Sequence, residues 1–468
     1  MTDPHFVSPN EIRAKFSQAM SAMYQKEVPL YGDLLELVAE TNRQVLREDA
    51  ALAHCLQITG EIGRLAMERH GAIRVGTAQE LHTLRRLFNV MGMSPVGYYD
   101  LAVAGVPVHS TAFRAQHESD LQASPFRIFT SLLRLELIEN ASLRELAQRL
   151  LDRRSIFTKR TLELIAQHEN QGGLNGEQAQ EFIVQALETF RWHRTATVST
   201  HEYRQLHDQH RLIADVVAFR GPHINHLTPR TLDIDRVQAA MPGRGITPKA
   251  VIEGPPPRRC PILLRQTSFK ALEEEVAFIE PDGHQVTGHH TARFGEIEQR
   301  GIALTPKGRA LYDRLLQATQ DALPAPPTEK NAPQYNQLLA ENFQDFPDDY
   351  GALREQQLAW FRYFPTECGL AAKDTLDKHS TLEQLIALDY IRFQPLVYED
   401  FLPVSAAGIF QSNLGDSHHV PFGAASSRMV FEQALGMKVI DELELYQQTQ
   451  QRSLHACAQA LGLSALKA

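Results

Sequence analysis

An internal repeat constrains what this chain can fold into more than any other feature of the sequence. A Gly-x-Ser/Thr-Pro segment at residues 92–95 returns at residues 245–248, and residues 108–114 resemble residues 264–270. The pattern of hydrophobic residues around each copy predicts a strand, a helix and three further strands. We therefore expect two βαβββ units, paired in one curved sheet, within an α+β fold.

One histidine occupies the same place in both copies. The same interval separates His70 from Phe113 and His226 from Phe269. Each histidine lies beside the first predicted strand of its copy, so pairing of these equivalent strands would bring the two imidazoles together. Because imidazole is the commonest metal ligand, the repeat predicts a metal site that takes one histidine from each half.

A site of this kind needs a third ligand, usually a carboxylate. The last predicted strand of the second copy contains Glu296 and Glu298, which share one face because they are two residues apart. Glu296 follows Gly295, where a backbone can approach closely, and it is the preferred ligand. Glu298 remains an alternative. In the first copy we expect Thr130 at the position of Glu296, so that only one copy supplies the acid.

The sequence has 20 histidines, and most are expected to be surface or hydrogen-bonding residues. His223 is the nearest competitor of His226, but residues three apart on a strand point to opposite faces. His207 and His210 have a spacing that could chelate a metal on a helix, although a solvated face is the simpler interpretation. The His-His pairs at residues 289–290 and 418–419 have no third ligand nearby.

Composition excludes several classes of function. The 468 residues carry 47 Lys+Arg against 56 Asp+Glu, a net charge of −9, which disfavours binding of nucleic acid or an anionic membrane. The four cysteines are far apart and form no CxxC motif, which excludes a disulfide scaffold and fits a reducing compartment. With no signal peptide and no apolar run of about 20 residues, we expect a cytoplasmic protein. No Walker, GxSxG or GxGxxG motif is present.

The pattern predicts four segments. Residues 1–137 contain a helical lead-in and the first βαβββ copy, and residues 138–215 form a helical insertion. The second copy and a following helix occupy residues 216–325. A Pro/Ala-rich linker around residues 322–333 leads into a mostly helical C-terminal region, residues 326–468, whose long loop is expected to contribute to the site.

Four stretches of sequence resemble one known family. They are residues 70–74 (His-Gly-Ala-Ile-Arg), 222–230 (Pro-His-Ile-Asn-His-Leu-Thr-Pro-Arg), 293–300 (Arg-Phe-Gly-Glu-Ile-Glu-Gln-Arg) and 401–415. The family is that of 2-oxoadipate dioxygenase/decarboxylase, also called hydroxyglutarate synthase. The resemblance extends from Phe6 to the last helix, and it implies a vicinal-oxygen-chelate-like core, in agreement with the paired repeat.

The resemblance also implies an activity and a set of site residues. Members of the family are iron(II) enzymes of lysine breakdown that convert 2-oxoadipate and dioxygen to D-2-hydroxyglutarate and carbon dioxide. The similarity makes His70, His226 and Glu296 the metal ligands and assigns Arg74 to a substrate carboxylate. It further places two residues of the C-terminal loop, Val404 and Ser405, at the substrate.

The residues suit this chemistry. Two imidazoles and one carboxylate leave one face of an octahedral metal open for a chelating 2-oxo acid and dioxygen. A guanidinium binds a carboxylate through two hydrogen bonds and stays charged, and Arg74 shares a strand face with His70. Two other hypotheses remain open at this point. One is a glyoxalase-like, metal-dependent isomerase or lyase, and the other is a small-molecule-binding protein without catalysis. The oligomeric state is left open.

Overall fold

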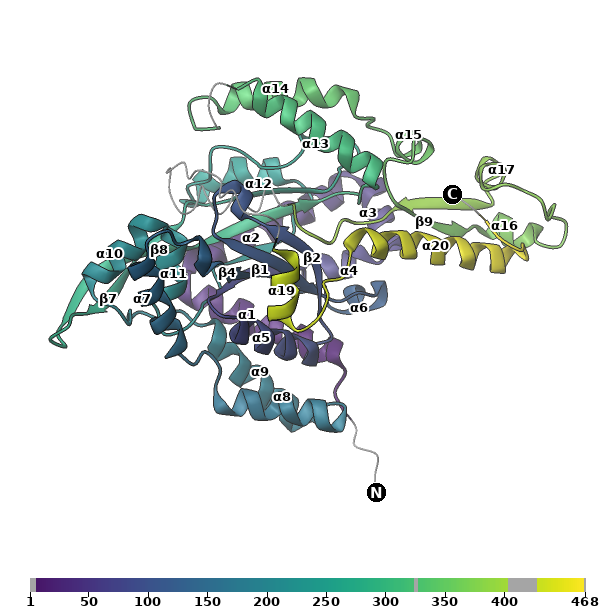
Figure 1. Ribbon diagram of the computed structural model, residues 1–468. Helices are drawn as coiled ribbons and strands as arrows, with labels where there is room; N and C mark the ends of the chain where they lie inside the picture. Colours follow the sequence, from purple (N-terminus) through teal and green to yellow (C-terminus); the bar gives the residue numbers. More distant parts are fainter. Residues whose placement is uncertain (1–5, 324–326, 403–426, 467–468) are drawn as a thin grey trace.

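The two halves of the repeat form one eight-stranded sheet (Figure 1). The computed structural model describes residues 6–323, 327–402 and 427–466. The strands lie in the order β2-β3-β4-β1-β5-β8-β6, and β7 pairs with β8 outside this path. The first copy consists of β1 (Arg69–Val75), α5 (Ala78–Val90), β2 (Ser94–Asp100), β3 (Val108–Arg114) and β4 (Arg127–Leu133). The second consists of β5 (His226–Pro229), α12 (Ile234–Ala240), β6 (Leu264–Ser268), β7 (Leu272–Ile279) and β8 (Gln285–Arg300).

The pairing confirms the α+β fold and the duplication. In each copy the first strand runs parallel to the last, β1 with β4 and β5 with β8. In each copy the last strand also pairs antiparallel with an inner strand, β4 with β3 and β8 with β6. The two copies meet at the antiparallel pair of β1 and β5, in the middle of the sheet.

Two strand predictions in the second copy are wrong. The hydrophobic pattern predicts a strand at residues 249–253, but this segment forms only isolated bridges, Pro248–Phe269 and Glu253–Gln266. Prolines flank it at positions 248 and 255–257, and a proline cannot donate to a ladder. The pattern also predicts strand structure over residues 216–226, but within that range only His226 belongs to a strand, β5. Val216 and Val217 end helix α11, because a short apolar run fits a buried helix as well as a buried strand.

The other helices and strands surround this sheet. Before the first copy lie α1 (Pro9–Glu27), α2 (Pro29–Glu48), α3 (Ala50–Ile58) and α4 (Glu61–Leu65), and α6 (Glu118–Ala123) precedes β4. The insertion contains α7 (Ala141–Asp152), α8 (Lys159–Gln171), α9 (Gly176–Leu187), α10 (Thr200–Gln209) and α11 (Arg211–Val217). The C-terminal part contains α13 (Pro306–Asp321), α14 (Ala332–Asn342), α15 (Tyr350–Glu355), β9 (Phe361–Pro365), α16 (Glu367–Ala372), α17 (Leu382–Ala387), β10 (Ile391–Pro395), α19 (Arg428–Leu435) and α20 (Glu442–Leu461).

Local sequence signals account for several helix starts. Ser8 caps α1, and Thr77 with Glu80 forms a capping box at the start of α5. Asn175 with Gln178 forms another at the start of α9. The spacing of Ser142 and Glu145 predicts a helix start at Ser142, but Asn140 is the residue that caps α7, so the helix begins at Ala141.

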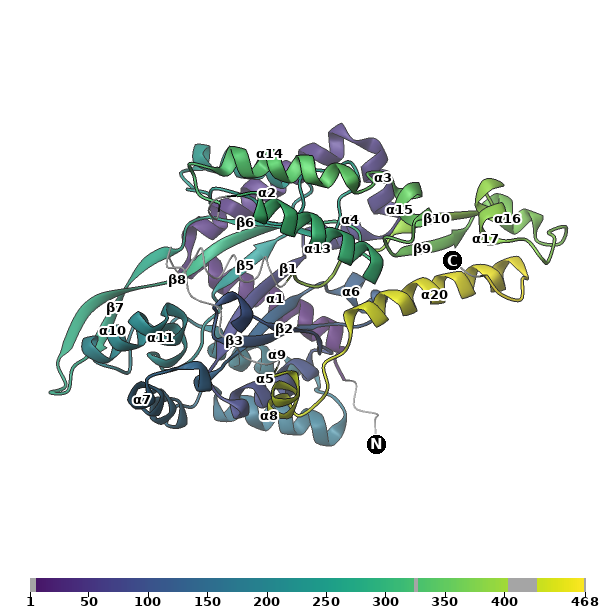
Figure 2. The same cartoon turned by 45° about the horizontal axis from the view of Figure 1, so that its top comes forward.

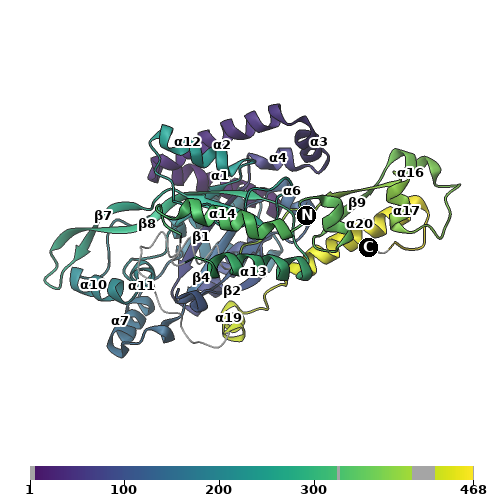
Figure 3. The ribbon, with the colours of Figure 1, turned by 90° about the horizontal axis from the view of Figure 1, so that it is seen from above.

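Three apolar cores hold these elements together. The largest joins α1, α2, α5 and α9 to one face of the central strands, through residues such as Ile73, Ile128, Leu227 and Ile297. A second core joins α7, α10 and α11 to the β2–β4 part of the opposite face. The third lies in the C-terminal part, where α20 runs beside β9 (Figure 2). The β7–β8 hairpin and the unit of β9, β10, α16 and α17 project from opposite ends of the molecule (Figure 3).

Among the described residues, no helix is both long and apolar enough to cross a bilayer.

Gly295 allows the strand that carries Glu296 to pack against the helices. A Cβ at this position would lie 2.4 Å from Phe269 Cε1 and 2.9 Å from Leu34 Cδ2. We expect Gly295→Ala to lower the free energy of unfolding by about 1–3 kcal/mol through overpacking. Urea denaturation measures this loss. Gly243→Ala is the control, because a Cβ at Gly243 meets nothing within 4 Å. Equal stability of the two variants would contradict this packing.

Candidate metal centre

The fold brings His70, His226 and Glu296 together at the centre of the sheet. Each offers a ligand atom, and these atoms all lie within 4.8 Å of one another. His70 Nε2 is 2.9 Å from Glu296 Oε1, and His226 Nε2 is 3.9 Å from the same oxygen. The three residues are buried, with exposed fractions of 0%, 5% and 1%. Within the described ranges of the chain this is the one such group of three His, Cys, Asp or Glu residues.

Strand register explains why these three side chains converge. In the antiparallel pair of β1 and β5, His70 lies opposite Thr228 and His226 lies opposite Ala72. The two histidines are thus diagonal neighbours on one face of the sheet, related by the approximate two-fold symmetry of the repeat. Strand β8 runs parallel to β5 on its other side, with Leu227 opposite Gly295, so Glu296 follows onto the same face.

The Glu296 carboxylate is held by two neutral donors. Thr228 Oγ1 donates to Oε1 at 2.9 Å, and Gln266 Nε2 donates to the same oxygen at 2.8 Å. Burial raises the pKa of Glu296, but His226, His70 and the hydrogen bond from Thr228 outweigh it, so the net shift is downward. The carboxylate is therefore ionised and oriented before any metal binds.

Glu298 lies on the other side of the His70 ring. Its Oε2 is 2.9 Å from His70 Nδ1, while His70 Nε2 faces Glu296. Arg300 binds Glu298 through two contacts of 2.8 Å, and Arg127 approaches it at 3.4 Å. Burial raises the pKa of Glu298, but Arg300, His70 and Arg127 bring it down to about 2. Glu298 therefore orients His70 from outside the cluster, an arrangement common around metal-binding histidines.

The donor set fits a divalent transition metal. Two imidazoles and one carboxylate form the set found in iron(II) oxygenases, which keep the remaining positions open. Burial lowers the pKa of His226 to about 4, although Glu296 opposes the shift, so this imidazole is in the neutral form that binds metals. Burial also lowers the pKa of His70. The charge of Glu298 and the contacts with Glu296 outweigh burial, so the net shift of the His70 pKa is upward. A cation between these side chains would replace the proton that His70 and Glu296 otherwise share.

The first copy has a phenylalanine where the second has its acid. Ala72 and Thr228 are equivalent, because each lies two residues after the histidine of its copy. Phe129 of β4 lies opposite Ala72, and the β5–β8 register continues to place Glu296 beside Thr228, so Phe129 is the equivalent of Glu296. Thr130 lies opposite Ile73 and belongs to the other face, so the predicted equivalence of Thr130 and Glu296 is wrong by one residue. Phe129 packs against Phe401, with ring centroids 5.1 Å apart. The conclusion that only the second copy supplies a carboxylate is unchanged.

Arg74 lies on the same face of the sheet as His70 and His226, at the next position along β1 on that face after the residue opposite His226. It is two residues along β1 from Ala72, the partner of His226, and its positive charge contributes to the low pKa of that histidine. Its NH1 donates to Asp215 Oδ2 at 2.6 Å. Arg74 is 3% exposed and thus belongs to the buried side of the site.

The loop residues Val404 and Ser405 lie outside the described residues. The described chain reaches the site just before them, at Phe401, whose ring centroid is 4.9 Å from that of His70. Asp400 is anchored by Arg114 at 2.6 Å and 2.9 Å. The segment that leads into the predicted substrate loop is therefore attached to the sheet beside the candidate ligand His70.

The competing histidines have other roles. His223 precedes β5, and its Nε2 lies 3.5 Å from Asp215. His290 Nε2 contacts the same oxygen of that aspartate, Oδ1, at 2.9 Å, and His210 caps helix α11. His207 lies beside Asp208 on α10, with a third of its side chain exposed. The pair at residues 418–419 lies outside the described residues.

A buried network of ion pairs lies behind the ligands, and sequence reasoning did not find it. It contains four arginines and four glutamates that are all buried: Arg64, Arg127, Arg230, Arg300, Glu61, Glu68, Glu298 and Glu399. Arg127 NH2, for example, contacts Glu68 at 2.7 Å and Glu399 at 2.6 Å. Thr228 and Gln266 were missed as well. Alternating polar residues on β8 are a signal for such a polar face, but they do not reveal the partners on other segments.

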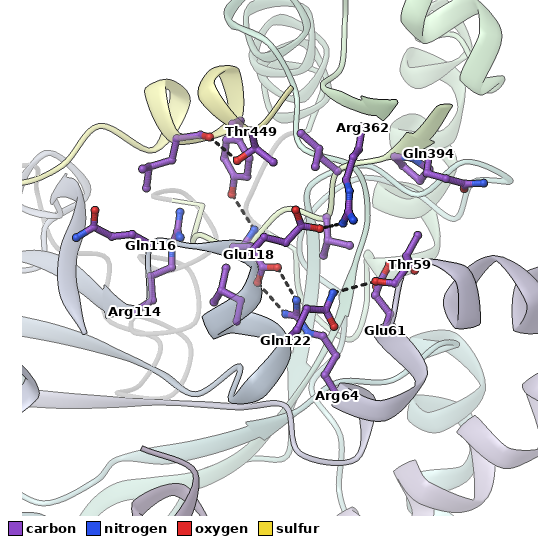
Figure 4. A pocket seen from close by; sticks show the side chains of 17 residues that line it. Thr59, Glu61, Arg64, Arg114, Gln116, Glu118, Gln122, Arg362, Gln394 and Thr449 are labelled. Atoms are coloured by element: carbon purple, nitrogen blue, oxygen red, sulfur yellow. Dashed lines mark hydrogen bonds and ion pairs between the residues drawn. The ribbon is translucent and has the colours of Figure 1, made fainter. Parts of the chain in front are cut away.

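A cavity of about 60 Å³ opens on the far side of this network, between α4, α6 and α20 (Figure 4). None of the three candidate ligands lines it. Its main cations already have partners, since Arg64 binds both oxygens of Glu399 at 2.9 Å and Arg362 pairs with Glu118. This volume has room for a few water molecules, and none of His70, His226 and Glu296 borders it.

The chain is similar to known proteins over nearly its whole length. The sequence profile of the 2-oxoadipate dioxygenase/decarboxylase family matches residues 16–413. A protein of that name from Pseudomonas putida is 65% identical over 461 residues, covering 98% of this chain and 99% of the relative. One from Escherichia coli K12 is 57% identical over 451 residues, covering 96% and 98%.

Solved structures agree with this assignment. The crystal structure of the hydroxyglutarate synthase from Pseudomonas putida in complex with 2-oxoadipate superposes with a TM-score of 0.91 at 63% identity, covering 98% of this chain and 100% of that one. A second structure of the enzyme from the same organism superposes with a TM-score of 0.89. Profile, relatives and structures together show that this chain belongs to the 2-oxoadipate dioxygenase/decarboxylase family.

Proposed function

We propose that this protein is an iron(II)-dependent enzyme that converts 2-oxoadipate and dioxygen to D-2-hydroxyglutarate and carbon dioxide, as a step in lysine breakdown. The observation that carries the proposal is the buried cluster of His70, His226 and Glu296 at the pseudo-two-fold axis of the sheet. The names of the relatives and the 2-oxoadipate complex of the Pseudomonas putida enzyme support the choice of substrate. Four cysteines, all free, support a cytoplasmic location.

The three ligands would hold iron(II) through His70 Nε2, His226 Nε2 and the Glu296 carboxylate. Bound iron supplies the activation of dioxygen and an attachment point for the 2-oxo acid end of the substrate. The overall reaction balances: 2-oxoadipate loses its C1 carboxylate as carbon dioxide, and both atoms of dioxygen enter the five-carbon product. The substrate itself is the 2-oxo acid that is decarboxylated, so no second oxo acid is required.

The protein's own side chains bind and orient the substrate. We propose that Arg74 holds the far carboxylate of the dicarboxylic acid, because guanidinium binds a carboxylate in a planar, two-bond arrangement. Arg74 lies beyond His226 on the shared face, so this binding would stretch the substrate from the metal past His226. Val404 and Ser405 are proposed to contact the substrate from the C-terminal loop. Thr228, Gln266 and Glu298 hold the ligands in place.

Oxygen stoichiometry tests the proposed reaction. With iron(II), the protein is expected to consume one dioxygen and release one carbon dioxide for each 2-oxoadipate. Mass spectrometry of a reaction under labelled dioxygen is expected to find both labelled atoms in 2-hydroxyglutarate. Glu296→Ala is expected to lose turnover and to retain less iron, as measured by metal analysis, because one of three ligands is gone.

Glu273→Ala is the matched control, since Glu273 lies exposed on β7, away from the cluster. It is expected to keep both turnover and iron. Full activity of Glu296→Ala would refute the ligand assignment. Turnover without oxygen under another divalent metal would instead select an isomerase or lyase.

Arg74→Ala is expected to lower kcat/KM for 2-oxoadipate about 100-fold, because two hydrogen bonds to a charged group are lost. The same variant should change kcat/KM for 2-oxohexanoate, which lacks the far carboxylate, by less than about 2-fold. Steady-state oxygen consumption with the two substrates measures the contrast. Equal losses for both substrates would remove Arg74 from the carboxylate site.

Glu298→Gln is expected to weaken iron binding about 10- to 100-fold, because the carboxylate that orients His70 is replaced by a neutral amide. Competition with a chromogenic chelator measures the affinity. Thr130→Val is the control. Thr130 is buried on β4, the strand beside β1, and its hydroxyl has no hydrogen-bond partner among the described residues. Unchanged affinity in Glu298→Gln would show that Glu298 plays no part in holding the metal ligand.

A further inference from the structure

Arg74 is the end of a continuous chain of hydrogen bonds that enters the site from the helical insertion. Its NH1 donates to Asp215 Oδ2 at 2.6 Å. The other oxygen, Oδ1, lies 2.9 Å from His290 Nε2. His290 Nδ1 in turn lies 2.7 Å from the hydroxyl of Tyr203. A neutral imidazole satisfies both of its contacts, donating from Nε2 to Asp215 and accepting at Nδ1 from Tyr203.

The members of this chain come from three separate parts of the sequence. Tyr203 lies on α10 and Asp215 on α11, both in the insertion between the two repeat copies. His290 lies on β8, in the half of the strand that pairs with β7. Arg74 lies on β1. The contact between Asp215 and Arg74 is therefore a polar link between the insertion and the face of the sheet that carries the candidate metal ligands, beside the apolar core that the two share.

Aromatic packing fixes the geometry of this chain of hydrogen bonds. The Trp192 ring stacks on His290, with centroids 6.0 Å apart and planes 11° apart. Phe219 covers the same imidazole at 4.8 Å. Asp215 itself is 3% exposed, and Asn225 Nδ2 approaches its Oδ2 at 3.4 Å. A side chain enclosed in this way has one available orientation, so it can hold its partner in one orientation as well.

The charges around Asp215 keep it ionised. Burial raises the pKa of the carboxyl, but His223, Arg74 and His290 oppose burial and bring it well below its usual range. His223 contributes its charge only at low pH, because burial lowers its own pKa to about 3 despite the nearby Asp215. At neutral pH the charge that pairs with Asp215 is that of Arg74. Arg74 and Asp215 therefore form a buried pair with no net charge.

We propose that Asp215 is a positioning residue for substrate recognition, which fixes the plane of the Arg74 guanidinium so that it selects dicarboxylic 2-oxo acids. This inference rests on the proposed function, in which Arg74 binds the far carboxylate. Asp215 neutralises the positive charge of Arg74, so long-range attraction contributes little to recognition of the substrate. Recognition then depends on the directed hydrogen bonds of the guanidinium, which favour a planar carboxylate at one distance from the metal. His290 and Tyr203 support Asp215 from behind.

Asp215→Asn tests this role, since it keeps the size of the side chain and removes its charge. We expect kcat/KM for 2-oxoadipate to fall about 10-fold, as for the loss of one hydrogen bond to a charged group, and kcat/KM for 2-oxohexanoate to change less than about 2-fold. Glu80→Gln is the control. Glu80 is a buried carboxylate bound to Arg154 at 2.6 Å and 2.8 Å, away from the metal ligands. It should lower the melting temperature without changing the ratio between the two substrates.

A double-mutant cycle separates positioning from a purely structural role. If Asp215 acts through Arg74, Arg74→Ala with Asp215→Asn should lose no more activity on 2-oxoadipate than Arg74→Ala alone. Additive losses, or equal losses for both substrates in Asp215→Asn, would overturn the inference. His290→Ala repeats the test with the aspartate intact, so it decides the matter if Asp215→Asn does not fold. If Arg74→Ala lowers kcat/KM equally for both substrates, the proposed role of Arg74 is refuted, independently of the role of Asp215.

Discussion

The antiparallel pairing of β1 with β5 is the constraint on which the site depends. It places His70 opposite Thr228 and His226 opposite Ala72, so both imidazoles lie on one face of the sheet. Because side chains alternate along a strand, a shift of the pairing by one residue would send one histidine to the apolar face. Gly71 keeps this pairing close, since a Cβ there would lie 2.7 Å from Ile224 Cδ1 and 3.0 Å from the His226 carbonyl oxygen.

The buried ion pairs behind the ligands are the electrostatic counterpart of this pairing. Burying any one of these charges alone is costly, so each arginine and glutamate needs its partners in place. Arg127 links Glu298, which touches His70, to Glu399, which precedes the C-terminal loop. The network therefore ties the orientation of His70, a candidate metal ligand, to the docking of a segment more than 300 residues further along the chain.

Sequence reasoning was most successful where the repeat applied. Two short similarities were enough to select His70 and His226 from 20 histidines, and alternation on one strand supplied Glu296, all of which the fold brings together. It was least successful where non-local partners decide. Three features depend on which segments lie side by side: the missing strand at residues 249–253, the equivalence of Glu296 with Phe129, and the contact of Arg74 with Asp215. A hydrophobic pattern does not contain that information.

The sequence by itself determined the α+β architecture, the duplication and the residues that form the candidate metal cluster, because these follow from periodicity and spacing along one chain. Only the tertiary structure decided what surrounds each of these residues. Glu298 became the support of His70 because Arg300 and Arg127 hold it on the opposite ring nitrogen. Asp215 became the partner of Arg74 because the insertion folds back onto the sheet. In both cases the physical reason is the same: a buried charge takes its partner from whatever segment packing brings beside it.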